Sequence, residues 1–141
     1  TDSLFKNISL ALTKKKPEIK IYGSNYKTKD GTTVRDYIHV SDLAEVHYKI
    51  LRKISGNNKS LIVNCGYNRG LSVKAVVNEF TKQSNKKIKI LYQKRRRGDL
   101  AIVIANNRKL KKTIKWEPKY SKLSKVVKSC INWEKELTGK F

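Results

Sequence analysis

The sequence predicts an α/β fold in which short strands are interleaved with about five helices. Apolar residues recur at a spacing of three and four in about five stretches, which is typical of amphipathic helices. Short runs rich in isoleucine, valine and tyrosine separate these stretches, and such residues favour strands. The length of 141 residues fits a single unit with a modest core, and we expect one domain over residues 1–141.

The N-terminal part of the chain predicts a helix followed by a short strand. The apolar stripe of the helix consists of Leu4, Phe5, Ile8, Ala11 and Leu12. Pro17 ends this helix, because proline disfavours helical backbone in the residue before it. Residues 20–22 then predict a strand that ends at Gly23.

Residues 34–44 predict a strand that runs directly into a helix. Tyr37, Ile38 and Val40 favour the strand, and Ser41 or Asp42 can cap the first turn of the helix. The helix itself is expected from a stripe formed by Leu43, Val46, Ile50, Leu51 and Ile54. A turn is expected at residues 55–58.

The second half of the chain continues this alternation. Residues 61–65 predict a buried strand, residues 66–70 a loop, and residues 88–92 a half-buried strand. Ser72 can cap a helix whose inner face includes Phe80. Residues 106–114 predict a short basic helix. The last helix is expected to pack through Leu123, Val126, Val127, Cys130, Ile131 and Trp133.

Composition limits the classes of function. The 33 Lys and Arg residues against 11 Asp and Glu give a formal charge of +22, but they are spread along the whole chain. We therefore expect a solvated basic surface that attracts nucleic acid only non-specifically. No apolar run reaches membrane-spanning length, and Cys65 and Cys130 are expected to be free thiols in the cytoplasm. No spacing of ligands indicates a metal site, and His39 and His47 read as ordinary packing or surface residues.

A cation at the junction between a strand and a helix suits a phosphate group, because a guanidinium can bind two phosphate oxygens at once. Arg35 occupies this position, although Arg35, Asp36 and Tyr37 equally fit a structural ion pair beside a half-buried ring. The longer stretch of residues 21–44 resembles the UDP-glucose 4-epimerase family of the extended short-chain dehydrogenase/reductase superfamily. The resemblance includes the loop Tyr-x-Thr-x-Asp-Gly-Thr at residues 26–32.

The resemblance assigns roles to several residues. Residues 95–99 match an Arg-Arg-x-Gly-Asp element in which Arg96 would bind the diphosphate together with Arg35, and Asp99 the ribose. Val103 stands where many family members have tyrosine, which would leave space for an N-acetylated hexose. The remaining UDP-sugar contacts implied by the resemblance are Ser3, Leu4, Lys20, Ile21, Tyr22, Tyr37 and Val73.

Two motifs of the superfamily are missing from the sequence. No Gly-x-x-Gly-x-x-Gly is present, and none of the seven tyrosines is followed by lysine four residues later. The resemblance therefore implies the C-terminal substrate-binding part of an epimerase, without the N-terminal Rossmann domain and without catalytic residues in this chain. The complete enzyme would interconvert UDP-glucose and UDP-galactose with bound NAD. The resemblance also allows a homodimer. We expect the chain alone to be inactive.

Two other functions stay open at this point. One is a different NAD-dependent nucleotide-sugar enzyme, a dehydratase or a decarboxylase, which the product formed by the full-length protein would distinguish. The other is a basic nucleic-acid-binding module, for which salt-insensitive and sequence-selective binding would be the diagnostic result.

Overall fold

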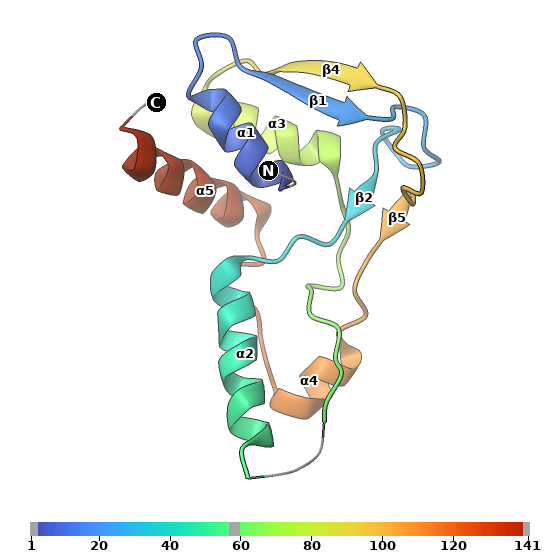
Figure 1. Cartoon of the computed structure of the whole chain (residues 1–141), viewed down its shortest axis with the longest axis vertical. Coiled ribbons are helices and arrows are strands. Elements are labelled where there is room, and N and C mark those ends of the chain that lie inside the picture. The colour runs from blue at the N-terminus through green and yellow to red at the C-terminus, as the bar shows by residue number, and fades with distance from the viewer. Residues whose placement is uncertain (1–2, 57–59, 140–141) are drawn as a thin grey trace.

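The structure is a computed structural model that describes residues 3–56 and 60–139. Five helices are interspersed with five short strands in this part of the chain (Figure 1). In order they are α1 (Leu4–Leu12), β1 (Glu18–Tyr22), β2 (Val34–Arg35), α2 (Val40–Ile54), β3 (Leu71–Ser72), α3 (Val73–Ser84), β4 (Lys89–Gln93), β5 (Ile102–Val103), α4 (Arg108–Ile114) and α5 (Leu123–Thr138). The α/β class predicted from the sequence is thereby confirmed.

The larger core lies where α1, α3 and α5 pack together with the two-stranded parallel sheet of β1 and β4 (Figure 1). Phe80 is fully buried there, and its ring meets that of Phe5 edge to face at 5.6 Å between centroids. Buried aromatic pairs of this kind contribute beyond the apolar area they remove from water. The other buried members are Ile8, Leu12, Ile19, Ile21, Val76, Val77, Ile88, Val127 and Ile131.

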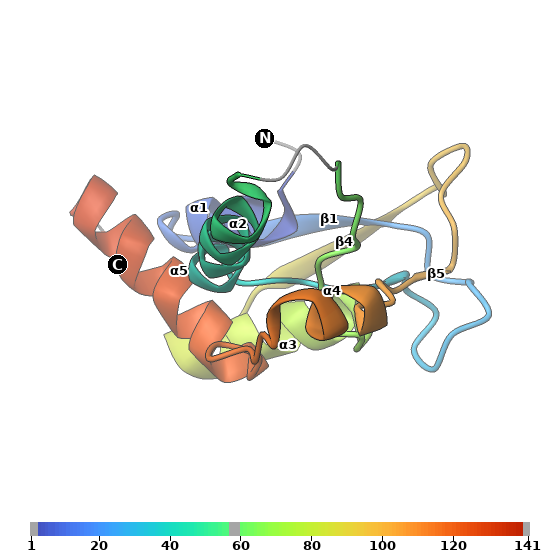
Figure 2. The ribbon, with the colours of Figure 1, turned by 90° about the horizontal axis from the view of Figure 1, so that it is seen from below.

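A smaller core lies at the opposite end of the molecule (Figure 1), where α2 and α4 are in contact; seen from below, these two helices lie nearest the viewer (Figure 2). Val46, Leu110 and Trp116 form its buried centre. A three-stranded sheet in the order β3-β2-β5 lies between the two ends (Figure 1). In this sheet β2 is antiparallel to β3 and parallel to β5, which fixes the position of Arg35 from both sides.

Serine side chains cap two of the predicted helices, and of these caps Ser72 was the one expected from the sequence. The Ser72 hydroxyl accepts a hydrogen bond from the backbone N–H of Ala75 at 3.1 Å, which satisfies a donor in the first turn of α3. Ser3 caps α1 in the same way through the N–H of Lys6. Residues 66–70 form the predicted loop, and Asn68 in it has a left-handed backbone with φ 57°, a conformation that asparagine tolerates.

The junction before α2 differs from the sequence prediction. Regular strand is confined to Val34 and Arg35, whereas Tyr37 and Ile38 have irregular backbone and Val40 already begins the helix. The cap is His39, whose Nδ1 accepts a hydrogen bond from the Ser41 N–H at 3.1 Å. The predicted caps Ser41 and Asp42 were wrong. The Asp42 carboxylate instead lies buried against another part of the chain.

Three further expectations about packing were wrong. Residues 61–65 form no strand, and Ile62 is 83% exposed, because no neighbouring strand among the described residues hydrogen-bonds to this segment. Leu51 is 61% exposed and Trp133 is 59% exposed, so neither belongs to a core. The turn predicted at residues 55–58 lies partly outside the described residues.

Candidate functional site

A cavity of ≈ 860 Å³ opens between α1, β1 and the loop that follows β4. Every site residue predicted from the sequence lines this cavity except Val103, although these residues come from five separate parts of the chain. The predicted residues that line it are Ser3, Leu4, Lys20, Ile21, Tyr22, Arg35, Tyr37, Val73, Arg96 and Asp99.

Arg35 is held in the wall of the cavity by a dense set of hydrogen bonds. One guanidinium nitrogen, Nη1, donates to the carbonyl oxygens of Val34 and Leu100, each at 2.8 Å. The other, Nη2, donates to the Asp99 carboxylate at 3.1 Å. These contacts join β2 to the segment before β5. The orientation of the Arg35 guanidinium is therefore fixed by its hydrogen bonds to the sheet and not left to the flexible arginine side chain.

Arg96 reaches the same cavity from the loop after β4. Its guanidinium lies over the ring of Tyr22, 4.0 Å from the ring centroid, which is a favourable cation–π arrangement. A tight turn follows, in which the Asp99 N–H donates to the Arg96 carbonyl at 3.3 Å and Gly98 has φ 83°. This turn returns Asp99 to Arg35, so the two arginines and the aspartate share one site.

Tyr37 supplies an aromatic wall. Its ring meets Phe5 edge to face, with centroids 5.1 Å apart. Burial raises the pKa of the Tyr37 hydroxyl to about 12, an effect that the nearby charge of Arg35 opposes only in part. The hydroxyl therefore remains protonated at neutral pH, where it can donate a hydrogen bond but cannot serve as a base.

The floor of the cavity is one edge of β1. All five residues of β1 line the cavity, and within the described residues the strand pairs only with β4, on its other side. Unpaired backbone N–H and C=O groups at such an edge can hydrogen-bond a flat polar ring. The strand thus offers the cavity a fixed row of donors and acceptors.

The charge of the lining favours an anion. Its cationic side chains are Lys14, Lys20, Arg35 and Arg96, whereas its carboxylates are Glu18 and Asp99. Because Asp99 is paired with Arg35, the excess positive charge belongs to the lysines and Arg96. Among the described residues no group of three His, Cys, Asp or Glu side chains could hold a metal ion, and no helix could span a membrane.

The cavity lining differs from the sequence prediction at Val103 and at a few residues that were not predicted. Val103 pairs with Arg35 across β2 and β5, is 45% exposed, and lies outside the cavity lining, so its role in sugar selection stays a prediction. The sequence did not indicate that Phe5, Asn7 and Thr33 line the cavity. Phe5 could have been found, since it lies next to Leu4 on the predicted apolar stripe.

The family model described as GDP-mannose 4,6 dehydratase matches residues 1–129. The chain belongs to this family. A curated UDP-glucose 4-epimerase of Azospirillum brasilense is 38% identical over 134 residues, which is 95% of this chain and 38% of the relative. The resemblance to UDP-glucose 4-epimerases seen in the sequence is therefore confirmed.

Two solved structures agree with this assignment. A UDP-glucose 4-epimerase of Stenotrophomonas maltophila, with bound NAD and formylated UDP-arabinopyranose, matches with a TM-score of 0.91 and 27% identity, over 99% of this chain and 41% of that one. A UDP-Glc/GlcNAc 4-epimerase of Campylobacter jejuni matches with a TM-score of 0.82 and 36% identity, over 94% of this chain and 40% of that one. The chain thus spans about two fifths of the length of these relatives.

Proposed function

We propose that residues 1–141 form the UDP-sugar-binding unit of a UDP-glucose 4-epimerase, the isomerase that interconverts UDP-glucose and UDP-galactose. The single observation that carries the proposal is the common cavity of Arg35 and Arg96. These two residues are 61 positions apart in the sequence, and no local motif would require them to meet. A shared anion explains why both guanidinium groups line one cavity.

The lining residues suit the separate parts of a nucleotide sugar. Arg35 and Arg96 would bind the two phosphates, and Asp99, held by Arg35, would accept a hydrogen bond from a ribose hydroxyl. The open edge of β1 at Lys20, Ile21 and Tyr22 would hydrogen-bond the uracil ring. Aromatic and apolar contacts would come from Tyr37, Leu4 and Val73, with Ser3 as a further polar neighbour.

Catalysis in the proposed enzyme requires groups that these residues do not provide. Oxidation and reduction at C4 of the hexose are the chemistry that NAD supplies when bound, and the glycine pattern that holds such a cofactor is absent from the sequence. The Tyr-x-x-x-Lys pair for proton transfer is absent as well. We therefore assign substrate binding to these 141 residues, and both NAD binding and proton transfer to a Rossmann domain outside them.

The test is a titration of the 141-residue chain with UDP and with GDP, followed by nitrogen-15 NMR. We expect weak but saturable binding of UDP. GDP should bind at least about fivefold more weakly, because guanine would leave hydrogen-bonding groups of the site unpaired. The shifted amides should belong to β1, β2 and residues 96–99. Preference for GDP, or shifts confined to other surfaces, would contradict the proposal.

A coupled assay tests the assignment of catalysis. The purified chain should give no turnover of UDP-galactose in the presence of NAD, because neither the cofactor-binding pattern nor the proton-transfer pair is present. Turnover by the chain alone would show that catalytic residues lie among these 141. Formation of a 4-keto-6-deoxy sugar by the full-length protein would instead identify a dehydratase.

A further inference from the structure

Arg95, the residue before Arg96, makes a separate set of contacts outside the cavity lining. Its guanidinium lies over the ring of Tyr26, 4.1 Å from the centroid. Its Nε donates to the side-chain oxygen of Asn25 at 2.7 Å, and its Nη2 donates to the Asn25 backbone carbonyl. One side chain therefore joins the loop after β4 to the loop after β1.

The loop that receives Arg95 is firmly built. Tyr26 is only 6% exposed, and its backbone N–H donates to the Gly31 carbonyl at 2.9 Å. The Thr28 hydroxyl donates to the Thr32 carbonyl at 2.7 Å. Asp30 accepts a hydrogen bond of 2.5 Å from Ser72, the cap of α3, which ties this loop to the larger core.

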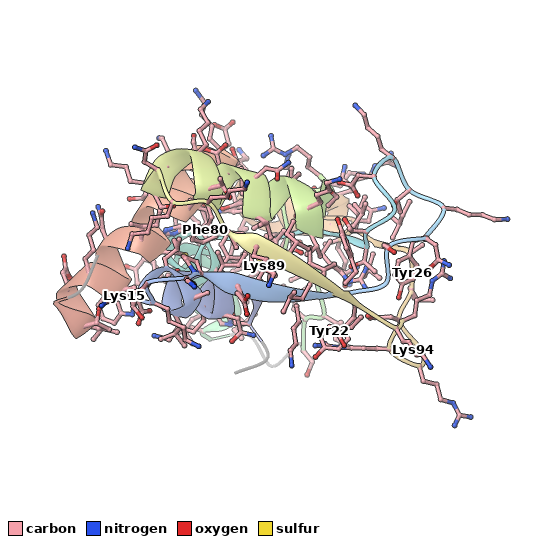
Figure 3. All side chains as sticks on the ribbon, turned by 90° about the horizontal axis from the view of Figure 1, so that it is seen from above. Lys15, Tyr22, Tyr26, Phe80, Lys89 and Lys94 are labelled. Carbon is pink, nitrogen blue, oxygen red and sulfur yellow. The ribbon has the colours of Figure 1, made fainter. Side chains whose placement is uncertain are left out.

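Gly23 permits the close approach of the two loops. Its backbone has φ 86°, and its N–H donates to the Gln93 carbonyl at 2.9 Å, which extends the pairing of β1 with β4 by one step. A Cβ at this position would collide with the Tyr26 ring and lie 2.8 Å from Cγ of Arg95. Figure 3 shows Tyr22, Tyr26 and Lys94 at one end of this sheet, with Lys15 toward the other.

The loop that carries Arg96 and Asp99 is thus fixed on both sides. Arg95 holds one side against Tyr26 and Asn25, and the ion pair between Asp99 and Arg35 holds the other. Arg95 lies over the Tyr26 ring and Arg96 over the Tyr22 ring, so anchoring Arg95 fixes the backbone from which Arg96 reaches Tyr22 and the cavity.

We propose that Arg95, Tyr26 and Asn25 form a latch that pre-positions Arg96 and Asp99 for a nucleoside diphosphate, so that Arg95 acts as a positioning residue and not as a ligand contact. This rests on the proposed function for the identity of the anion. Fixing a loop before binding spares the cost of ordering it in the complex. The latch therefore raises affinity without touching the ligand.

Tyr26→Leu is the decisive variant, since it removes the aromatic face and leaves every positive charge in place. In the full 141-residue chain we expect UDP binding, measured by NMR titration, to weaken about tenfold, as the loss of a cation–π contact and of loop order implies. Amide hydrogen exchange of Asp99, whose N–H donates to the Arg96 carbonyl, should quicken by about the same factor in the absence of UDP.

Matched variants separate the latch from its alternatives. Tyr26→Phe keeps the ring and removes a buried hydroxyl that has no hydrogen-bond partner among the described residues, so binding and exchange should equal those of the wild type. Arg97→Ala removes one exposed charge from the same loop and should leave exchange unchanged. Arg95→Lys keeps the charge but lacks the planar fork, and it should behave as Tyr26→Leu does.

Each outcome decides one claim. Wild-type exchange and wild-type UDP affinity in Tyr26→Leu would overturn the latch, as would an effect of Arg97→Ala as large as that of Arg95→Lys. Should Tyr26→Leu fail to fold, Asn25→Ala at an exposed position replaces it, with a loss of about threefold expected from one hydrogen bond. Absence of UDP binding by the wild type would refute the proposed function, and the exchange rates alone would then decide the latch.

Discussion

Replacement of Arg96 by alanine gives a quantitative test of the anion site. A hydrogen bond to a charged group contributes about 1.5–3 kcal/mol, which corresponds to about 10- to 150-fold in affinity. UDP binding should therefore weaken by that factor in Arg96→Ala. Uridine has no phosphate, so its affinity should fall only about twofold, because Tyr22 loses its contact with the Arg96 guanidinium. Parallel NMR titrations of the two ligands measure the difference.

Two variants serve as controls for this experiment. Arg97→Ala removes the same charge from an exposed neighbour, and it should weaken the affinity for UDP by no more than about twofold at 0.15 M salt. Arg96→Lys keeps the charge but cannot bind two oxygens in one plane, so we expect an intermediate loss. Equal losses for UDP and uridine in Arg96→Ala would refute the reasoning, because the effect would then come from the shape of the pocket.

Three further predictions concern stability and selectivity. Asp42 is fully buried and accepts hydrogen bonds from the Tyr67 hydroxyl and from the N–H groups of Lys119 and Tyr120. Burial acts to raise its pKa, but these hydrogen bonds outweigh burial and lower it. The stabilisation is therefore complete above the unfolded pKa of about 3.9 and is lost as pH falls through the lower folded value. Asp42→Asn should cost about 2–4 kcal/mol in urea unfolding at pH 7 and progressively less as the pH falls through the lowered folded pKa, and a loss independent of pH would contradict this. Phe80→Ala should cost about 3–5 kcal/mol in the same assay, and a loss under 1 kcal/mol would show that Phe80 is not central to the larger core. Val103→Tyr should weaken UDP-N-acetylglucosamine relative to UDP-glucose by about tenfold in competition binding, and strong exclusion of the acetylated sugar by the wild type would count against a role for Val103.

Elements with a regular apolar stripe were predictable from the sequence, because a helix satisfies its own backbone and needs only one face to pack. This pattern predicted α1, α3 and α5, and the alternation of apolar and polar residues predicted the strand β4. The two arginines were also foreseeable, since the resemblance to a family links positions that are distant in the chain.

Features that depend on a partner segment were not predictable. Residues 61–65 have the composition of a buried strand, but a strand needs a neighbour, and none of the described residues pairs with them. His39 is buried and stacks on Tyr120 with ring centroids 4.5 Å apart, as a packing residue would, but its role as the cap of α2 was not predicted. The contacts of Arg95 with Tyr26 likewise join two loops whose approach only the fold reveals.

A crystal structure of the chain with UDP tests the central claim most directly. The account predicts the two phosphates between Arg35 and Arg96, with the uracil at the edge of β1 and the Asp99 carboxylate within hydrogen-bond distance of the ribose. A second cavity lies along β4 and the segments that precede β1 and β4, lined by Lys15, Lys16, Lys87 and Lys89 among others. UDP bound among those lysines, with Arg35 and Arg96 uninvolved, would contradict the account.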